Sequence, residues 1–207
     1  MLRILGRVNS FNVRKVLWLC DEIGIPYERE DWGRGYRTTT DAEFASVNPI
    51  GLVPAVVEDG VPLRESNTIV RYLASKYGPD ELYPRDLVLR AQVEQWMDWA
   101  NYETSISLRG AFLGGMLNEP PWNNPWFIDQ CRKQITKEVG QLEDHFQGVG
   151  PYVTGATFTV GDIPIGLVVN RWFCLTFQRP HYPAVAAYYD VLGQRPAYQR
   201  HVRNGLP

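Results

Sequence analysis

The chain has 207 residues, of which 44% are hydrophobic and 13% aromatic, and its formal net charge is −2. This length allows one large domain or two small ones, and nothing in the balanced charge suggests a nucleic-acid or membrane-surface partner. No apolar run approaches the ~18 residues of a spanning helix, and no signal-peptide pattern opens the chain. We therefore expect a cytosolic protein with no nucleic-acid or membrane partner.

The cysteines and histidines predict neither a disulfide framework nor a metal site. The three cysteines lie far apart without a Cys-x-x-Cys pattern, and the three histidines lack metal-ligand spacing. Each cysteine falls on the apolar face of a predicted helix, where a free thiol behaves as a small hydrophobe. We expect buried, unpaired thiols at Cys20, Cys131 and Cys174.

The chain begins with the pattern of a strand, a helix and a second strand. Residues 2–5 are a short apolar strand, a helix runs from about residue 13 to 23 before a Gly and a Pro, and residues 27–31 return as a strand. Strand–helix–strand connections are right-handed, so the two strands should be parallel neighbours.

A hairpin and a further helix are predicted after Pro54. Pro54 is tolerated as the first residue of a strand because it cannot donate to the ladder. Asp59-Gly60 then supplies a tight turn, and residues 62–64 form the second strand. The helix that begins at Ser66 has an apolar stripe formed by Ile69, Val70, Leu73 and Tyr77.

The start of that helix has the chemistry of a ligand site. A helix N-terminus offers unpaired N–H groups and partial positive charge, so Ser66 could hold a carboxylate while Glu65 holds an ammonium group. The main chain at Val53, before Pro54, would be a strand edge open to an extended peptide. The alternative is that Ser66 is an ordinary helix cap.

These residues form a recognisable pair of motifs, Asn48-Pro49-x-Gly51-x-Val53-Pro54 followed by Glu65-Ser66-x-x-Ile69-x-x-Tyr72-Leu73. The pattern resembles the glutathione-binding core of the cytosolic glutathione transferases, and the later half of the chain fits the same family. The resemblance implies an α/β thioredoxin-like domain, a cis Pro54 and a γ-glutamyl group held by Glu65 and Ser66.

The first strand-to-helix turn contains Ser10 and Asn12 where a redox protein of this fold would have Cys-x-x-Cys. Ser10 matches the Ser-type transferases and Asn12 matches bacterial relatives with an Asn in this turn; the Tyr of other classes is missing. Either side chain could stabilise a glutathione thiolate, and Arg7, at the end of the first strand, is expected to point toward the same site. Asn12 could instead cap the helix, and Arg7 could be an ordinary surface residue.

In the resembling family the segment after the second strand reaches over the glycine end of glutathione, and the resemblance implies the same placement here. Arg37 is the expected partner of the glycyl carboxylate, with Thr40 and Arg34 as rivals. Six basic residues would make the cleft positive, as two ligand carboxylates require. They are Arg7, Arg14, Lys15, Arg34, Arg37 and Arg64.

The second half predicts helices only. A connector with breaker residues spans 78–85, a long helix ends before Asn118, and a second helix follows Pro125. Thr159 and Asp162 form a capping-box variant that opens a helix. In the resembling family this box starts the buried helix of the C-terminal domain, so the resemblance implies that Asp162 is structural. Two short helices, each with Pro in its first turn, close the chain over 183–192 and 196–202.

Arg109 should look into the cleft, where it could offset a thiolate or hold an anionic electrophile; an ordinary salt bridge is the alternative. The electrophile pocket is expected to be mostly aromatic, which suits an apolar or aromatic electrophile. Its predicted residues are Phe11, Arg109, Phe112, Met116, Trp122 and Trp172.

We therefore expect a glutathione-binding thioredoxin-like domain over 1–77, a linker over 78–85 and an all-helical electrophile domain over 86–207. The predicted activity is glutathione transfer, with glutathione as co-substrate, to a small or aromatic electrophile. Haloacid dehalogenation and a detoxifying homodimer fit this hypothesis. Two alternatives remain: a glutathione-dependent disulfide or peroxide reductase, and a non-catalytic binding or assembly module.

Overall fold

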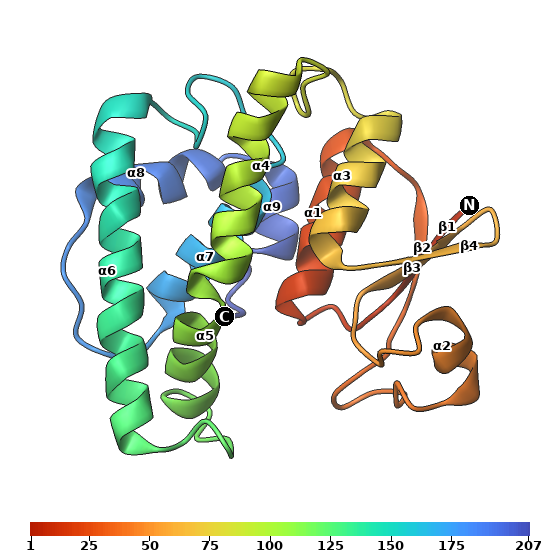
Figure 1. The fold of residues 1–207 in the computed structure, drawn as a ribbon, viewed down its shortest axis with the longest axis horizontal. Coiled ribbons are helices and arrows are strands. Elements are labelled where there is room, and N and C mark those ends of the chain that lie inside the picture. Colours follow the sequence, from red (N-terminus) through yellow and green to blue (C-terminus); the bar gives the residue numbers. More distant parts are fainter.

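The computed structural model describes residues 1–207, and its N-terminal part is a four-stranded mixed sheet with helices on both faces. The strands are β1 (Leu2–Leu5), β2 (Tyr27–Glu30), β3 (Ala55–Glu58) and β4 (Val61–Arg64), in the order β2-β1-β3-β4. β1 and β2 are parallel, as the crossover rule predicts, and the other two pairs are antiparallel. This is the thioredoxin-like arrangement (Figure 1).

Two helices, α1 (Phe11–Ile23) and α3 (Ser66–Tyr77), lie side by side on one face of the sheet. α1 begins two residues earlier than predicted because Ser10 has the extended backbone of an N-cap. Its C-terminal end is as predicted, since Gly24 takes the left-handed conformation at φ 70°. On α3 the predicted apolar stripe is buried except at Tyr77, which is 45% exposed.

The sequence reading missed α2 (Ala42–Val47), which covers the opposite face of the sheet. Six residues are too few to show helical periodicity. The local signal is Asp41, whose carboxylate accepts the Glu43 N–H at 2.9 Å as a helix cap. Phe44 anchors α2 by packing with Trp32 and the apolar residues of β1 and β3.

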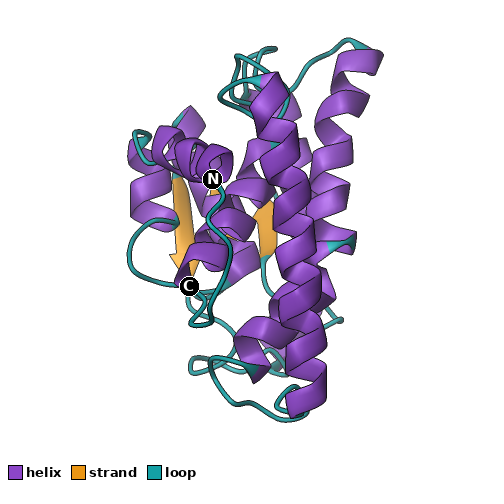
Figure 2. Ribbon diagram, turned by 90° about the vertical axis from the view of Figure 1, so that its left-hand side faces the viewer, coloured by secondary structure: helices purple, strands orange, loops and turns teal.

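The second half is all helical (Figures 1 and 2). Its helices are α4 (Leu87–Tyr102), α5 (Thr104–Arg109), the π-helical segment η1 (Gly110–Gly114), α6 (Pro125–Val149), α7 (Asp162–Cys174), α8 (Pro183–Leu192) and α9 (Pro196–His201). The single long helix predicted before Asn118 is therefore divided into α4, α5 and η1. No helix combines the length and apolarity that a bilayer crossing demands.

Asp162 holds the start of α7. Its buried carboxylate accepts the N–H groups of Thr159 at 2.8 Å and Val153 at 2.9 Å, and Tyr188 donates its hydroxyl at 3.1 Å. Burial raises the pKa of Asp162 to about 6. The expectation that this residue is structural is confirmed.

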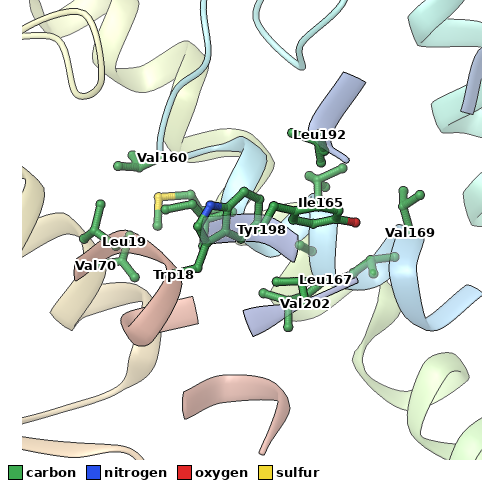
Figure 3. Packing of buried hydrophobic residues seen from close by; sticks show 14 of the residues in the cluster. Trp18, Leu19, Val70, Val160, Ile165, Leu167, Val169, Leu192, Tyr198 and Val202 are labelled. Carbon is green, nitrogen blue, oxygen red and sulfur yellow. The ribbon is translucent and has the colours of Figure 1, made fainter. Parts of the chain in front are cut away.

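The two halves share one hydrophobic core, which α7 and α9 form with α1 (Figure 3). Trp18 of α1 packs on Tyr198 of α9 with ring centroids 4.8 Å apart. Gly166 of α7 permits this approach, since a Cβ atom there would lie 2.9 Å from the Trp18 ring and 2.8 Å from Leu192. Such packing fixes the helical half against the turn that precedes α1.

Candidate functional site

A cavity of about 500 Å³ lies where the turn before α1 faces the helical half. The first half contributes Arg7, Asn9, Ser10, Phe11, Asn12, Lys15 and Arg34. The second half contributes Ala100, Asn101, Thr104, Ser105, Leu108, Arg109, Phe112, Leu113, Leu117, Glu119, Arg171, Leu206 and Pro207. The wall is rich in cations and amides.

Ser10 lies at the N-terminus of α1 with a side chain that makes no capping hydrogen bond. It is 7% exposed and lines the cavity. Its hydroxyl and the free N–H groups of the first helical turn are thus available to an anion in the cavity. Asn12 also lines the cavity from inside the first turn, so the alternative of Asn12 as the helix cap is wrong.

Arg7 and Arg34 stand close together on the α/β side of the cavity. Arg7 donates to Asn9 Oδ1 at 2.8 Å, and burial together with the charge of Arg34 lowers the pKa of Arg7. Arg34 forms a two-pronged ion pair with Glu119, both N–O distances being 2.6 Å. Because Glu119 follows η1, this pair joins the two halves across the cavity.

Arg171 is the most enclosed arginine of the wall. It is 9% exposed, and its guanidinium carbon lies 4.5 Å from the ring centroid of Phe11 and 4.3 Å from that of Phe112. One nitrogen donates to the main-chain oxygen of Pro207 at 3.3 Å, and Nε has no partner. Burial lowers the pKa of Arg171 to about 9, so it remains a cation at neutral pH.

Arg109 faces the same region without a carboxylate partner. Its guanidinium carbon lies 5.6 Å from the centroid of the Trp122 ring, and it forms no ion pair. The alternative of an ordinary salt bridge for Arg109 is therefore wrong. The charges of Arg109 and Arg171 are therefore available to a ligand in the cavity.

Three of the six predicted pocket residues line this cavity, and three do not. Phe11, Phe112 and Arg109 line the cavity, but Met116, Trp122 and Trp172 do not. Trp172 is 1% exposed and packs against Phe177 and Tyr182 in the core. Consecutive residues on a helix point in directions about 100° apart, so Trp172 turns inward where Arg171 turns to the cavity.

Glu65 and Ser66 stand at the head of α3, as predicted, and the Val53–Pro54 bond is cis. Glu65 has φ 66°, a backbone conformation unusual outside glycine and found preferentially at functional sites. Ser66 is buried, with Oγ 3.4 Å from the Lys15 ammonium. The head of α3 therefore contacts a residue of the cavity wall.

Arg37 and Thr40 lie away from the cavity wall, whereas their rival Arg34 belongs to it. Arg37 stacks 3.7 Å above the centroid of the Trp32 ring and bonds Glu43 at 2.6 Å. Thr40 bonds the hydroxyl of Thr38 at 2.9 Å. Arg14, expected in the cleft, is instead buried among carbonyl groups of the C-terminal segment.

Comparison with known proteins identifies the family. The family model "Glutathione S-transferase, N-terminal domain" matches residues 2–75. Glutathione S-transferase GstB of Escherichia coli K12 is 36% identical over 202 residues, 97% of each chain. The chain belongs to the glutathione transferase family.

The solved structures agree with this assignment. The theta class glutathione S-transferase of Xanthomonas axonopodis pv. citri with glutathione bound is 35% identical and has a TM-score of 0.92, covering 100% of this chain and 99% of that one. Its apo form has a TM-score of 0.83 at 34% identity, with coverage of 100% and 98%. The protein is thus a glutathione transferase that uses glutathione as co-substrate.

Two cations of the transferase were not singled out by sequence reasoning. Lys15 was grouped with five other basic residues of the cleft, and Arg171 lay unnoticed beside the apolar residues of α7. The sequence feature that could have identified them is a charged residue within an otherwise apolar helical stretch. Such residues are seldom fully buried unless they have a binding partner or a functional role.

Proposed function

We propose that this transferase stabilises the glutathione thiolate with Ser10 and directs it at a small electrophile that bears an anionic group. The cationic wall of the cavity carries the proposal. Arg7, Lys15, Arg109 and Arg171 face it without an acidic side-chain partner, and Glu119, the one acidic side chain of the wall, is paired with Arg34. Such a wall favours an anion over a neutral ligand.

Thiolate stabilisation needs no general base. A free thiol has a pKa of about 8.5, and each unit of lowering corresponds to about 1.4 kcal/mol. One hydrogen bond to a charged group contributes ~1.5–3 kcal/mol. The Ser10 hydroxyl, which has no partner in the structure, could therefore supply a lowering of one to two units at the start of α1. Asn12 is the proposed second donor.

The rest of glutathione is proposed to extend from Ser10 toward α3. The main chain of Val53, beside Pro54, would pair with the cysteinyl residue, and Glu65 with Ser66 would hold the γ-glutamyl group. For the glycyl carboxylate, Arg34 is better placed than Arg37 or Thr40, because it lines the cavity.

The electrophile would lie between α1 and the helical half, against Phe11 and Phe112. Arg171 and Arg109 would hold its carboxylate, which leaves the carbon beside that carboxylate to meet the sulfur. For a 2-halo acid, the carbon–sulfur bond forms as the carbon–halogen bond breaks. The halide leaves with the bonding electrons, and the thiol proton has already passed to solvent. Proximity and thiolate stabilisation are the catalytic terms.

A paired-substrate assay tests this proposal. The rate with glutathione and bromoacetate, divided by the uncatalysed rate at the same pH, is compared with the same ratio for bromoacetamide. We expect at least a tenfold larger acceleration for the acid, because only the acid offers a charge to the two arginines. An equal or larger acceleration for the amide contradicts the anionic-substrate proposal and leaves the transferase assignment intact.

We further propose that the protein works as a cytosolic, detoxifying homodimer. Exposed apolar side chains along α4 and α5 support an interface there. They are Leu87, Val88, Tyr102 and Ile106. Light scattering after size exclusion would give twice the 23.7 kDa chain mass for the dimer, and a mass of one chain contradicts it.

A further inference from the structure

Lys15 is a buried cation without a counter-ion. It is 2% exposed, yet it belongs to the cavity wall. Its ammonium lies 3.1 Å from Asn67 Oδ1 and 3.4 Å from Ser66 Oγ, two neutral oxygens, and forms no ion pair. Burying a charge is costly unless it is both hydrogen-bonded and paired. The protein supplies Lys15 with hydrogen-bond partners and leaves the charge unpaired.

The charged groups around Lys15 do not neutralise it. Burial has the largest effect and lowers the pKa of Lys15 to about 7. Glu65 at the head of α3 attracts the ammonium and opposes this shift, while Arg171 of α7 and Arg71 of α3 repel the ammonium and add to it. Arg71 is itself paired with Asp98 of α4 at 2.6 Å. The ionisable groups of α9 pair further along α1, Arg200 and His201 with Asp21.

The position of Lys15 indicates what could pair with it. Its ammonium touches the hydroxyl of Ser66, the residue whose N–H and hydroxyl are proposed to hold the γ-glutamyl group. Lys15 lines the cavity and its ammonium contacts Ser66, so a carboxylate bound at the N-terminus of α3 would lie close to the ammonium. The Asn67 amide also donates to the Met97 carbonyl of α4 at 2.9 Å, which fixes the Asn67 oxygen that orients the ammonium.

We propose that Lys15 binds the α-carboxylate of the γ-glutamyl group of glutathione and takes up a proton when glutathione binds. This inference rests on the proposed placement of glutathione at Glu65 and Ser66. A carboxylate beside the ammonium favours its charged form. Because Lys15 is only partly protonated in the free protein at neutral pH, binding must draw the missing proton from solvent.

The sign of the pH dependence follows from this coupling. Below the pKa of the free protein Lys15 is already charged, so binding takes up no proton and affinity is highest. As the pH rises above about 7, each binding event must protonate Lys15, and affinity falls by up to about tenfold per pH unit. Proton uptake should be small well below this pKa and should rise as the pH passes through it.

Calorimetry with S-methylglutathione measures this uptake directly. The methylated sulfur cannot ionise, so proton release by the thiol does not interfere. Titrations at each pH in two buffers of different ionisation enthalpy give the number of protons taken up. The proposal is supported by uptake that rises between pH 6 and 8. Tight binding without any uptake over that range overturns it, while the transferase assignment stands.

A variant and an altered ligand identify the two partners. Lys15→Met should weaken S-methylglutathione binding about 10- to 100-fold at pH 6 and abolish the uptake. An analogue with 4-aminobutyryl in place of γ-glutamyl lacks only the α-carboxylate, and it should bind the wild type and Lys15→Met equally. Lys133→Met, at an exposed position on α6, is the matched control and should change nothing.

Other outcomes overturn the assignment. If Lys15→Met weakens both ligands equally, Lys15 only supports the fold of the site. If it binds S-methylglutathione normally but loses activity on bromoacetate and retains it on bromoacetamide, its carboxylate partner is the electrophile. If Lys15→Met does not fold, two measurements on the wild type still test the proposal: the proton uptake on binding S-methylglutathione, and the expected weaker binding of the 4-aminobutyryl analogue. Failure of the wild type to bind S-methylglutathione refutes the placement of glutathione itself.

Discussion

The two ends of the cavity each contain a buried cation, but the cations differ in kind. At the α3 end, the Lys15 ammonium is held by two neutral oxygens, and burial lowers its pKa to about 7. At the α7 end, the Arg171 guanidinium lies between two aromatic rings and its pKa is about 9. A guanidinium is more weakly hydrated and stacks on rings, so it keeps its charge where an ammonium releases its proton. The α3 end should titrate near neutrality, and the α7 end should not.

The largest expected effect on stability comes from removing the Asp162 carboxylate, which holds the N-terminus of α7. Asp162→Ala removes the acceptor of two buried N–H groups and should lower the free energy of unfolding by about 3 kcal/mol, measured by urea denaturation. Under conditions in which Asp162→Ala remains folded, its affinity for the electrophile should decrease more than its affinity for S-methylglutathione. A loss below about 1 kcal/mol would contradict the structural role.

Ser10→Ala should lower kcat by about 30-fold, which corresponds to about 2 kcal/mol for one hydrogen bond to the thiolate. Glutathione affinity should change little, because both cavity ends remain intact. The pKa of bound glutathione, followed by thiolate absorbance, should rise by one unit or more. Asn12→Ala is the comparison and should have the smaller effect. Unchanged turnover in both single variants and in the double variant would contradict the assignment of thiolate stabilisation to this turn.

Arg171→Met should lower kcat/KM for bromoacetate about tenfold, or about 1.4 kcal/mol, and leave bromoacetamide within about twofold. Arg171→Lys sharpens the comparison, since it places an ammonium at the α7 end. Burial lowers the pKa of an ammonium, so its activity on the acid should fall as the pH rises through neutrality. If the activity of Arg171→Lys on bromoacetate does not change with pH, the surroundings of residue 171, rather than the type of cation, would account for the difference in titration between the two ends of the cavity.

Glu119→Gln should have the smallest effect, less than about 1 kcal/mol on stability, because its partner Arg34 is more than half exposed. The released Arg34 adds a free charge to the cavity, so KM for bromoacetate should fall slightly. Steady-state kinetics at low and high salt would measure this. A rise in KM above about threefold would show that the ion pair shapes the site.

The position of the motif at the head of α3 could be predicted because that position depends on local backbone geometry. Pro54, Glu65 and Ser66 lie at a strand start and a helix start, which turn residues and helix signals locate in the sequence. Trp172 and Arg171 could not be assigned in the same way. Which residue of a helix faces a cavity depends on the rotation of α7 against α1, and that rotation is set by contacts such as Gly166 with Trp18.

The sequence by itself determined the order of the four strands and of the helices α1 and α3, the position of the Glu-Ser motif and the Ser10 turn, because these depend on neighbours within a few residues. The tertiary structure alone decided that Lys15 and Arg171 line the cavity while Arg14 and Trp172 are sequestered in the core. Adjacent residues on one helix share composition and periodicity. Their different environments arise from partners 50 or more residues away in the chain, such as Ser66 for Lys15 and the C-terminal carbonyls for Arg14.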